Sequence, residues 1–336
     1  MIKIKQVIST FFFILFILII GSYFTIYRTL YSLIIINDSF LYEIVYGSNV
    51  YNVLNDLQKK KIIKNNFWIY FLLKIHPKLK DFKANVYCLK KNMNIIDMLL
   101  LFNKGREYQF SIKFIQGTSL RFWLQKINNA KYIKHTSKLK NLEKLKKKLN
   151  IKNNYPLEGW FYPDTYFYNS HITDIQLLKK IYLRMKNIVD VLWNNRNKNL
   201  PYTNRYQMVI IASIIEKETS NPLEKKKIAS VLLNRLSKRM KLQVDSTIIY
   251  GIKYKLNYKL LYKNLKKKNK YNTYIIYGLP PSAITTPSIT SLKAAAQPIK
   301  SNYVYFVADH NGNHIFNTNF LDHKLTIQIL NILTKK

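Results

Sequence analysis

Cysteine, glycine and proline are scarce in this sequence, and so are acidic residues. Its 336 residues include one cysteine, eight glycines and nine prolines, while 48% of the residues are hydrophobic. A lone cysteine, Cys88, excludes an intrachain disulfide framework and any metal site that needs several cysteines. The composition also excludes collagen-like and low-complexity chains and argues against wholesale disorder. The length suits one large domain or two to three small ones.

The shortage of acidic residues leaves a formal net charge of +38, from 55 basic residues against 17 acidic ones. Such a charge is typical of nucleic-acid-binding proteins. Lysine, asparagine, isoleucine and tyrosine are, however, used heavily throughout, as A+T-rich coding would produce, and we favour this compositional explanation. The lysines also fall in runs at 138–152 and 263–270, a pattern typical of solvated helix faces or loops.

The N-terminus predicts a membrane anchor. No charged residue lies between Lys5 and Arg28, and the stretch 7–27 is strongly apolar. A helix of roughly 20 apolar residues spans a bilayer core of about 30 Å. The alternative is a cleaved signal peptide, but its apolar region is normally about 7–15 residues and ends in a small-residue cleavage site, which 21–24 does not resemble.

The charges that flank this span predict its orientation. Lys3, Lys5 and the α-amino group precede it, whereas only Arg28 follows closely, before Lys59. The flank with more positive charge stays in the cytoplasm. We therefore expect a single-pass bacterial inner-membrane protein with a cytoplasmic N-terminus and a periplasmic body. This location argues against nucleic acid as a partner.

The body divides into a small and a larger unit. Alternating and amphipathic patterns predict a compact α+β unit, with strands at 42–45, 84–89 and 109–115 and helices at 51–63, 67–75 and 94–102. A lysine-rich helical connector follows, and the larger unit begins near Tyr155.

The stretch 207–219 of the larger unit is almost wholly apolar and ends in Glu216-Lys217-Glu218. Glu218 follows three isoleucines by three, four and seven residues, so it shares their helix face, whereas Glu216 lies roughly 160° round the helix. Desolvation raises the pKa of a carboxyl and keeps it protonated near neutral pH, as a general acid requires. Glu218 is therefore the candidate acid.

The alternative is that both glutamates are solvated and pair with Lys217 or Lys225. A strong helix start follows, because Asn221 is a good N-cap, Pro222 suits the first helical position and Glu224 lies three residues after the cap. The chain therefore turns sharply just after Glu218, where a ligand can reach it.

Two further segments carry polar residues. The stretch 157–166 crowds four aromatics behind Glu158, a composition found in sugar-binding clefts and, more often, in protein cores. The stretch 242–251 has Gln243 and Asp245 where polar groups can face a cleft. Alternatively, Asp245 or Ser246 caps a short helix there.

The last part of the chain predicts a long loop at 271–287, a helix at 288–296, a hairpin of 303–309 with 314–318, and a helix at 322–333. His314 is expected to be a strand residue, since no partner spacing makes it a metal ligand.

Together these segments resemble the endolytic murein transglycosylases, the MltG/YceG-like family. The matching stretches are LEGWFYPDTY (157–166), ASIIEKET (212–219), the helix 228–239, LQVDSTIIYG (242–251), YNTY (271–274), GLPPSAITTPS (278–288), SLKAAAQP (291–298) and YVYFVAD with FNTN (303–319). One departure is Ser282, where the family usually has glycine.

The resemblance implies an α+β fold with an N-terminal transmembrane helix, a small LysM-like module and a larger mixed α/β catalytic domain. We expect the tip and anchor at 1–28, the module at 38–117, the connector at 118–154 and the catalytic domain at 155–336. Members of the family cut the β-1,4 bond between N-acetylmuramic acid and N-acetylglucosamine in nascent peptidoglycan strands and leave a 1,6-anhydro-muramyl end. The family's catalytic glutamate matches Glu218.

Motif membership adds a set of candidate substrate-binding groups, for which caps and loop ties are the alternative: Glu158, Gln243, Asp245, Tyr250, Asn272 and Asn317. No metal and no cofactor are expected. The expected partners are peptidoglycan strands, the inner membrane and peptidoglycan synthases, but not nucleic acid. The alternative function is a catalytically inactive, membrane-anchored peptidoglycan-binding scaffold.

Overall fold

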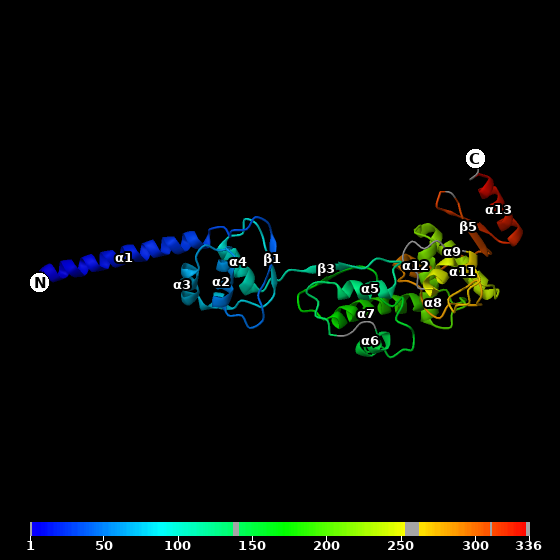
Figure 1. Cartoon of the computed structure of the whole chain (residues 1–336), viewed down its shortest axis with the longest axis horizontal. Helices are drawn as coiled ribbons and strands as arrows, with labels where there is room; N and C mark the ends of the chain where they lie inside the picture. Colours follow the sequence, from blue (N-terminus) through cyan, green and yellow to red (C-terminus); the bar gives the residue numbers. More distant parts are fainter. Residues whose placement is uncertain (1, 137–140, 253–261, 310, 334–336) are drawn as a thin grey trace. The chain divides into compact units, whose positions relative to one another are not determined.

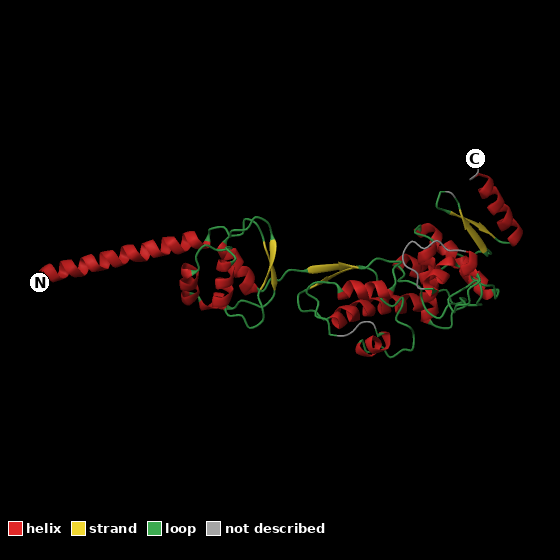
Figure 2. Cartoon of the chain, viewed as in Figure 1, coloured by secondary structure: helices red, strands yellow, loops and turns green. Residues whose placement is uncertain are grey.

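The computed structural model describes residues 2–136, 141–252, 262–309 and 311–333. Helices and short strands are mixed along the chain (Figure 1, Figure 2), which confirms the α+β class. Two compact units form, the first from Met1–Phe110 with Tyr168–Ser170 and the second from Ser111–Phe167 with His171–Lys336. The roles predicted for 1–28, 38–117, 118–154 and 155–336 stay predictions.

The elements of the first unit are α1 (Ile2–Leu30), β1 (Phe40–Glu43), α2 (Val50–Lys59), α3 (Phe67–Ile75), a 3₁₀ turn (Pro77–Lys80), β2 (Val86–Leu89) and α4 (Ile95–Lys104). Within α1, the 25 residues Gln6–Leu30 are long and apolar enough to cross a membrane. This helix is compatible with the predicted single-pass anchor, whose orientation stays a prediction.

The core of the first unit lies between helices and a two-stranded sheet. Strand β1 pairs antiparallel with β2. Helix α4 begins after its N-cap Asn94, whose Oδ1 accepts a hydrogen bond from the Asp97 amide at 2.8 Å. Its buried Phe102 stacks on Tyr42 of β1, with ring centroids 5.8 Å apart. The predicted helices and the strands near 42–45 and 84–89 are therefore confirmed, whereas the predicted strand at 109–115 forms Phe110–Lys113 and lies mostly in the second unit. The LysM-like character of the first unit stays a prediction.

The elements of the second unit, with two strands that reach its boundary, are β3 (Phe110–Lys113), α5 (Leu120–Asn128), α6 (Leu142–Lys148), β4 (Thr165–Tyr168), α7 (Asp174–Asn194), α8 (Arg205–Glu218), α9 (Pro222–Ser237), α10 (Asp245–Gly251), α11 (Tyr262–Leu265), α12 (Ile289–Ala296), β5 (Tyr305–Ala308), β6 (His314–Asn317) and α13 (Phe320–Leu333). Strand β3 neighbours β4, and β5 pairs antiparallel with β6 as the predicted hairpin.

Helix α8 is the centre of the second unit. Its residues from Met208 to Ile215 are all buried, and α7, α9 and α12 each pack against it, while α12 also packs against α7 and α9. The buried alanines 294–296 of α12 have small side chains, which let that helix approach its neighbours closely. A helix apolar on all sides must be enclosed in this way, because no face of it is suited to water.

The predicted start of α9 is confirmed. Asn221 Oδ1 accepts a hydrogen bond from the Leu223 amide at 3.1 Å, and Pro222 occupies the first helical position. Only three residues, 219–221, separate α8 from α9, so Glu218 stands at a sharp corner.

The aromatic segment 157–166 belongs to the core, as favoured from the sequence. Trp160, Phe161 and Tyr166 are buried, and the Trp160 ring stacks on Tyr206 of α8 with centroids 5.9 Å apart. Gly159 lies in the left-handed region at φ +81°. A Cβ atom there would come within 2.7 Å of the Ala283 Cβ.

Gly159→Ala should therefore lower the free energy of unfolding by about 2 kcal/mol or more, from left-handed strain and overpacking together. The matched control is Gly312→Ala, because Gly312 has φ +79° but no atom within 4 Å of an added Cβ. That variant should lose about 1 kcal/mol. Urea unfolding followed by tryptophan fluorescence measures both, and equal losses would contradict the packing argument.

Candidate active site

Glu218 is the last residue of α8, and its Oε1 accepts a hydrogen bond from Ser246 Oγ at 3.0 Å. Burial raises the pKa of this carboxyl above the usual value for glutamate. The hydrogen bond from Ser246 lowers the pKa in part, whereas the nearby Asp245 carboxylate raises it again. Glu218 therefore keeps its proton to a higher pH than a solvated glutamate does.

Glu216 lies two residues earlier and has an ionic partner. Its Oε2 is 3.1 Å from Lys225 Nζ, and it accepts hydrogen bonds from the Ser288 amide at 3.0 Å and from Ser291 Oγ at 2.6 Å. The Glu216 and Lys225 side chains are only 6% and 3% exposed. The alternative of two solvated glutamates is therefore wrong for Glu216, although Lys225 is indeed its partner. The helix-face argument missed its burial because the 288–291 segment closes over that side of α8.

Glu158 is a second buried carboxyl without a cation. Its Oε1 accepts a hydrogen bond from the Leu120 amide at 2.8 Å, and its Oε2 accepts one from Tyr250 OH at 3.0 Å. Burial raises the pKa of Glu158 to about 7. These contacts tie the start of α5 to α10, so Glu158 has the geometry of a buried structural tie.

Helix α10 connects the two carboxyls. Ser246 and Tyr250 are four residues apart on α10, so they share one face. Ser246 donates to Glu218 and Tyr250 donates to Glu158. The predicted capping of α10 by Asp245 or Ser246 is wrong, since Val244 is the N-cap and no side chain caps the helix. The Ser246 hydroxyl instead donates to Glu218, and Asp245 Oδ1 accepts a hydrogen bond from Tyr274 OH at 2.6 Å.

The other predicted polar groups are distributed more widely. Gln243 is exposed, and its Oε1 accepts a hydrogen bond from Arg235 at 3.1 Å. Asn272 is fully buried and donates to the Leu265 and Lys267 carbonyls at 2.9 Å, as a loop tie does. Asn317 donates to Thr326 of α13 at 3.2 Å. Of the six candidate substrate-binding groups, Asp245 is the one whose charge affects the pKa of Glu218.

The sequence argument missed two contacts at the corner. One is the Tyr274 hydroxyl on Asp245, although Tyr274 belongs to the quoted YNTY stretch. The other is Glu224, expected at the helix start for capping, whose Oε2 lies 2.8 Å from His314 Nδ1. Burial raises the pKa of Glu224, but the hydrogen bonds from His314 outweigh it and lower that pKa below the usual range. This pair joins β6 to α9 next to Glu218.

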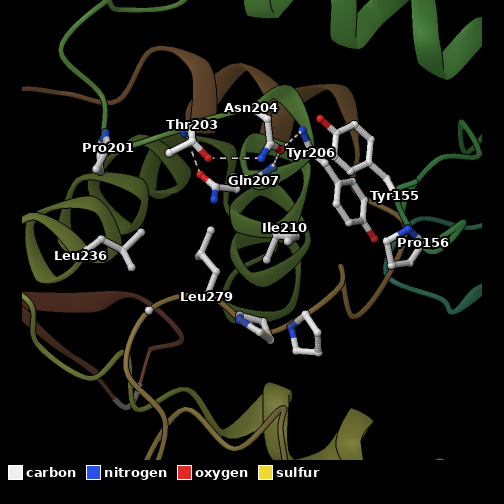
Figure 3. Close-up of a pocket in the computed structure, with 13 residues that line it drawn as sticks. Tyr155, Pro156, Pro201, Thr203, Asn204, Tyr206, Gln207, Ile210, Leu236 and Leu279 are labelled. Carbon is white, nitrogen blue, oxygen red and sulfur yellow. Dashed lines mark hydrogen bonds between the residues drawn. The ribbon is translucent and has the colours of Figure 1, made fainter. Parts of the chain in front are cut away.

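A cavity of about 460 Å³ lies at the opposite end of α8 (Figure 3). No acidic or basic side chain lines it, and its walls come from Tyr155, Pro156, Pro201, Thr203, Asn204, Tyr206, Gln207, Ile210, Leu236 and residues 278–281. At 1.5 Å per residue, Gln207 and Glu218 are roughly 17 Å apart along the helix axis. The cavity is therefore separate from the candidate acid.

Among the described residues, no group of three or more histidine, cysteine, aspartate or glutamate side chains lies together as a metal site would. At the corner, the Glu218 carboxyl of raised pKa lies beside the Ser246 hydroxyl, and the Asp245 carboxylate and the His314 imidazole are near it.

Comparison with known proteins places this arrangement in a family. The YceG-like family model matches residues 42–328. The chain belongs to the YceG-like family. It is 30% identical over 296 residues to the endolytic murein transglycosylase of Bacillus subtilis (strain 168), covering 82% of this chain and 81% of that protein.

Two further comparisons extend this relationship. The endolytic murein transglycosylase of Streptococcus pneumoniae serotype 2 (strain D39 / NCTC 7466) is 27% identical over 307 residues, which cover 81% of this chain but only 55% of that longer protein. The crystal structure of a YceG-like protein from Listeria monocytogenes superimposes with a TM-score of 0.52 at 25% identity, covering 86% of this chain and 99% of that one.

The buried Glu216–Lys225 pair leads to a stability prediction. Lys225→Met leaves the Glu216 carboxylate buried without its cation and should cost about 3–5 kcal/mol of unfolding free energy. The matched control is Lys186→Met, because the Lys186 side chain is 44% exposed and Asp190 keeps Arg205 as a second cation, so the expected cost is about 1 kcal/mol or less. Urea unfolding measures both. Equal costs would show that the buried pair has no special weight.

Proposed function

We propose that this chain is a peptidoglycan lytic transglycosylase, a carbon–oxygen lyase that acts on a polysaccharide. It cleaves the β-1,4 bond between N-acetylmuramic acid and N-acetylglucosamine within nascent strands, and so helps to terminate their elongation. The observation that carries the proposal is the half-buried Glu218 carboxyl of raised pKa, hydrogen-bonded to Ser246 at the corner between α8 and α9. The relatives named endolytic murein transglycosylases support the same conclusion.

The reaction requires one group that first gives and then takes a proton. Protonated Glu218 donates its proton to the glycosidic oxygen as the bond to the anomeric carbon breaks. The substrate's N-acetyl group stabilises the positive anomeric centre. Glu218, now ionised, accepts the proton of the muramyl C6 hydroxyl, whose oxygen attacks the anomeric carbon and closes the 1,6-anhydro ring. A carboxyl whose pKa is raised toward the ambient pH suits both steps.

The surroundings of Glu218 support these two states. Ser246 Oγ donates to Glu218 Oε1 and stabilises the ionised form after the first proton transfer. Burial favours the protonated form before it. In the proposal, Asp245 and the other motif residues Glu158, Gln243, Tyr250, Asn272 and Asn317 shape the cleft or support its walls.

We further propose that α1 anchors the chain in the bacterial inner membrane, with the N-terminus in the cytoplasm and the catalytic domain in the periplasm. The apolar length of α1 and the lysines before it support this placement. A LysM-like first unit would then hold the glycan near the membrane, where peptidoglycan synthases work.

Glu218→Gln should lower the rate of strand cleavage by about 10²–10⁴-fold, because the amide cannot donate the proton, while the fold is retained. The assay incubates the full-length protein in detergent with purified sacculi and detects anhydro-muropeptides by mass spectrometry. Glu143→Gln is the matched control, since Glu143 is exposed on α6, and it should keep full activity.

The products also separate the alternatives. Anhydro ends formed by the wild type but not by Glu218→Gln support the proposal. Full lytic activity in Glu218→Gln would overturn the assignment of the acid. Reducing ends would mean hydrolysis, in which a second carboxylate such as Asp245 activates water. Binding to sacculi without any cleavage would instead support the inactive scaffold.

Ser246→Ala should move the alkaline limb of the pH–rate profile to higher pH. The lost hydrogen bond favours the ionised form of Glu218, so its removal raises the pKa of Glu218 and extends the range in which the acid is protonated. Ser301→Ala is the control, because Ser301 contacts Ser230 rather than Glu218, and its profile should match the wild type. An unmoved limb in Ser246→Ala would mean that this limb reports another group.

A further inference from the structure

Helix α3 of the first unit is apolar on both of its sides. Ile69 and Leu73 point into the core and are buried. Phe67, Phe71 and Ile75, spaced four residues apart, form an outer stripe that is 60%, 43% and 56% exposed. Nine residues span roughly 13 Å, too short to cross a bilayer. A soluble surface does not account for this stripe.

The stripe lies next to the anchor helix. Helices α1 and α3 pack against each other, and Figure 1 shows α3 beside the end of α1. The α1 side chains at 6–21 are exposed, whereas Ser22, Ile26 and Leu30, again four residues apart, are partly covered. Leu30 packs against the core cluster that contains Ile69 and Leu73. The first unit therefore covers one face of the last turns of α1.

The length of α1 gives the depth of this contact. The 25-residue segment Gln6–Leu30 extends roughly 37 Å, against a hydrocarbon core of about 30 Å. The covered turns therefore reach the boundary between hydrocarbon and headgroups. Tyr27 and Tyr31 are exposed at this level of α1, as in the aromatic belts of membrane proteins.

We propose that α3 lies flat in this membrane–water interface, with Phe67, Phe71 and Ile75 in the acyl–headgroup boundary, as a second membrane contact of the chain. An interfacial helix has this arrangement of an apolar face with basic residues beside it. Lys74 and Lys78 are exposed next to the stripe and attract anionic headgroups.

Charge favours the bilayer over a second copy as the occupant. The chain carries a net charge of +38, so two copies repel one another, whereas an anionic lipid surface attracts each of them. The proposal rests on the placement of α1 in the membrane and not on the transglycosylase reaction. Its consequence is that two contacts, α1 and α3, fix the height and tilt of the first unit on the bilayer.

The test places a fluorophore on α3 of the full-length chain. Cys88→Ser removes the native thiol, and Phe71→Cys receives an environment-sensitive label before reconstitution into vesicles of phosphatidylcholine and phosphatidylglycerol. Nitroxides on the lipid chains should quench this label strongly, and aqueous iodide should quench it weakly. The matched control is Glu43→Cys, exposed on β1 at the side of the unit away from α1 (Figure 1), and its label should show the reverse.

A second variant tests the stripe itself. Phe67→Ser together with Ile75→Ser changes two exposed positions and should reduce lipid quenching at position 71 severalfold without lowering the unfolding midpoint. Iodide quenching at 71 equal to that at 43 would overturn the proposal. So would protection from both quenchers accompanied by crosslinking between two chains, which would identify a second copy. Cleavage of sacculi by the same labelled protein in detergent reports the proposed activity separately.

Discussion

The buried ion pair between Glu216 and Lys225 is the contact on which the architecture of the second unit depends. It joins the end of α8 to the first turn of α9, and the same carboxylate accepts hydrogen bonds from Ser288 and Ser291 at the start of α12. Two helices that follow one another in the chain, α8 and α9, thus meet the distant α12 at one oxygen. A carboxylate is stable at this buried position only while all of its partners are present. These contacts therefore fix the geometry of the corner.

The same pair determines what Glu218 can do. Lys225 Nζ also lies within 3.1 Å of the Ser288 and Thr290 hydroxyls. These contacts hold the ammonium group on the Glu216 side of α8. Glu218 follows Glu216 by two residues and therefore lies on another face of α8. Its hydrogen bond there comes from a hydroxyl instead of a cation. A lysine there would favour the ionised state, whereas at Glu218 burial raises the pKa and the Ser246 hydroxyl offsets only part of that rise. The Glu-Lys-Glu sequence therefore separates a structural carboxylate from the candidate acid.

Much of this could be predicted from the sequence where the signal is local. The cap Asn221, the apolar run of α8 and the two strand segments of the hairpin each specify their element through neighbouring residues, and those elements are found. The contacts that were missed join segments distant in sequence. Glu224 meets His314 across 90 residues, and Glu158 meets Tyr250 across 92. The periodicity of a sequence does not reveal contacts between distant segments. From local patterns alone, Glu224 is expected only at a helix start, and Asp245 or Ser246 only at a cap.

Helix α10 shows why such distant contacts matter for the candidate site. It has only seven residues, and a helix so short is marginal by itself, so its position depends on what its side chains bind. Tyr250 holds one end to Glu158, which in turn holds the Leu120 amide at the start of α5. Ser246, one turn away, then meets Glu218. The donor on the candidate acid therefore lies on a helix that a buried carboxyl helps to hold in place, and Glu158 is linked to Glu218 through α10.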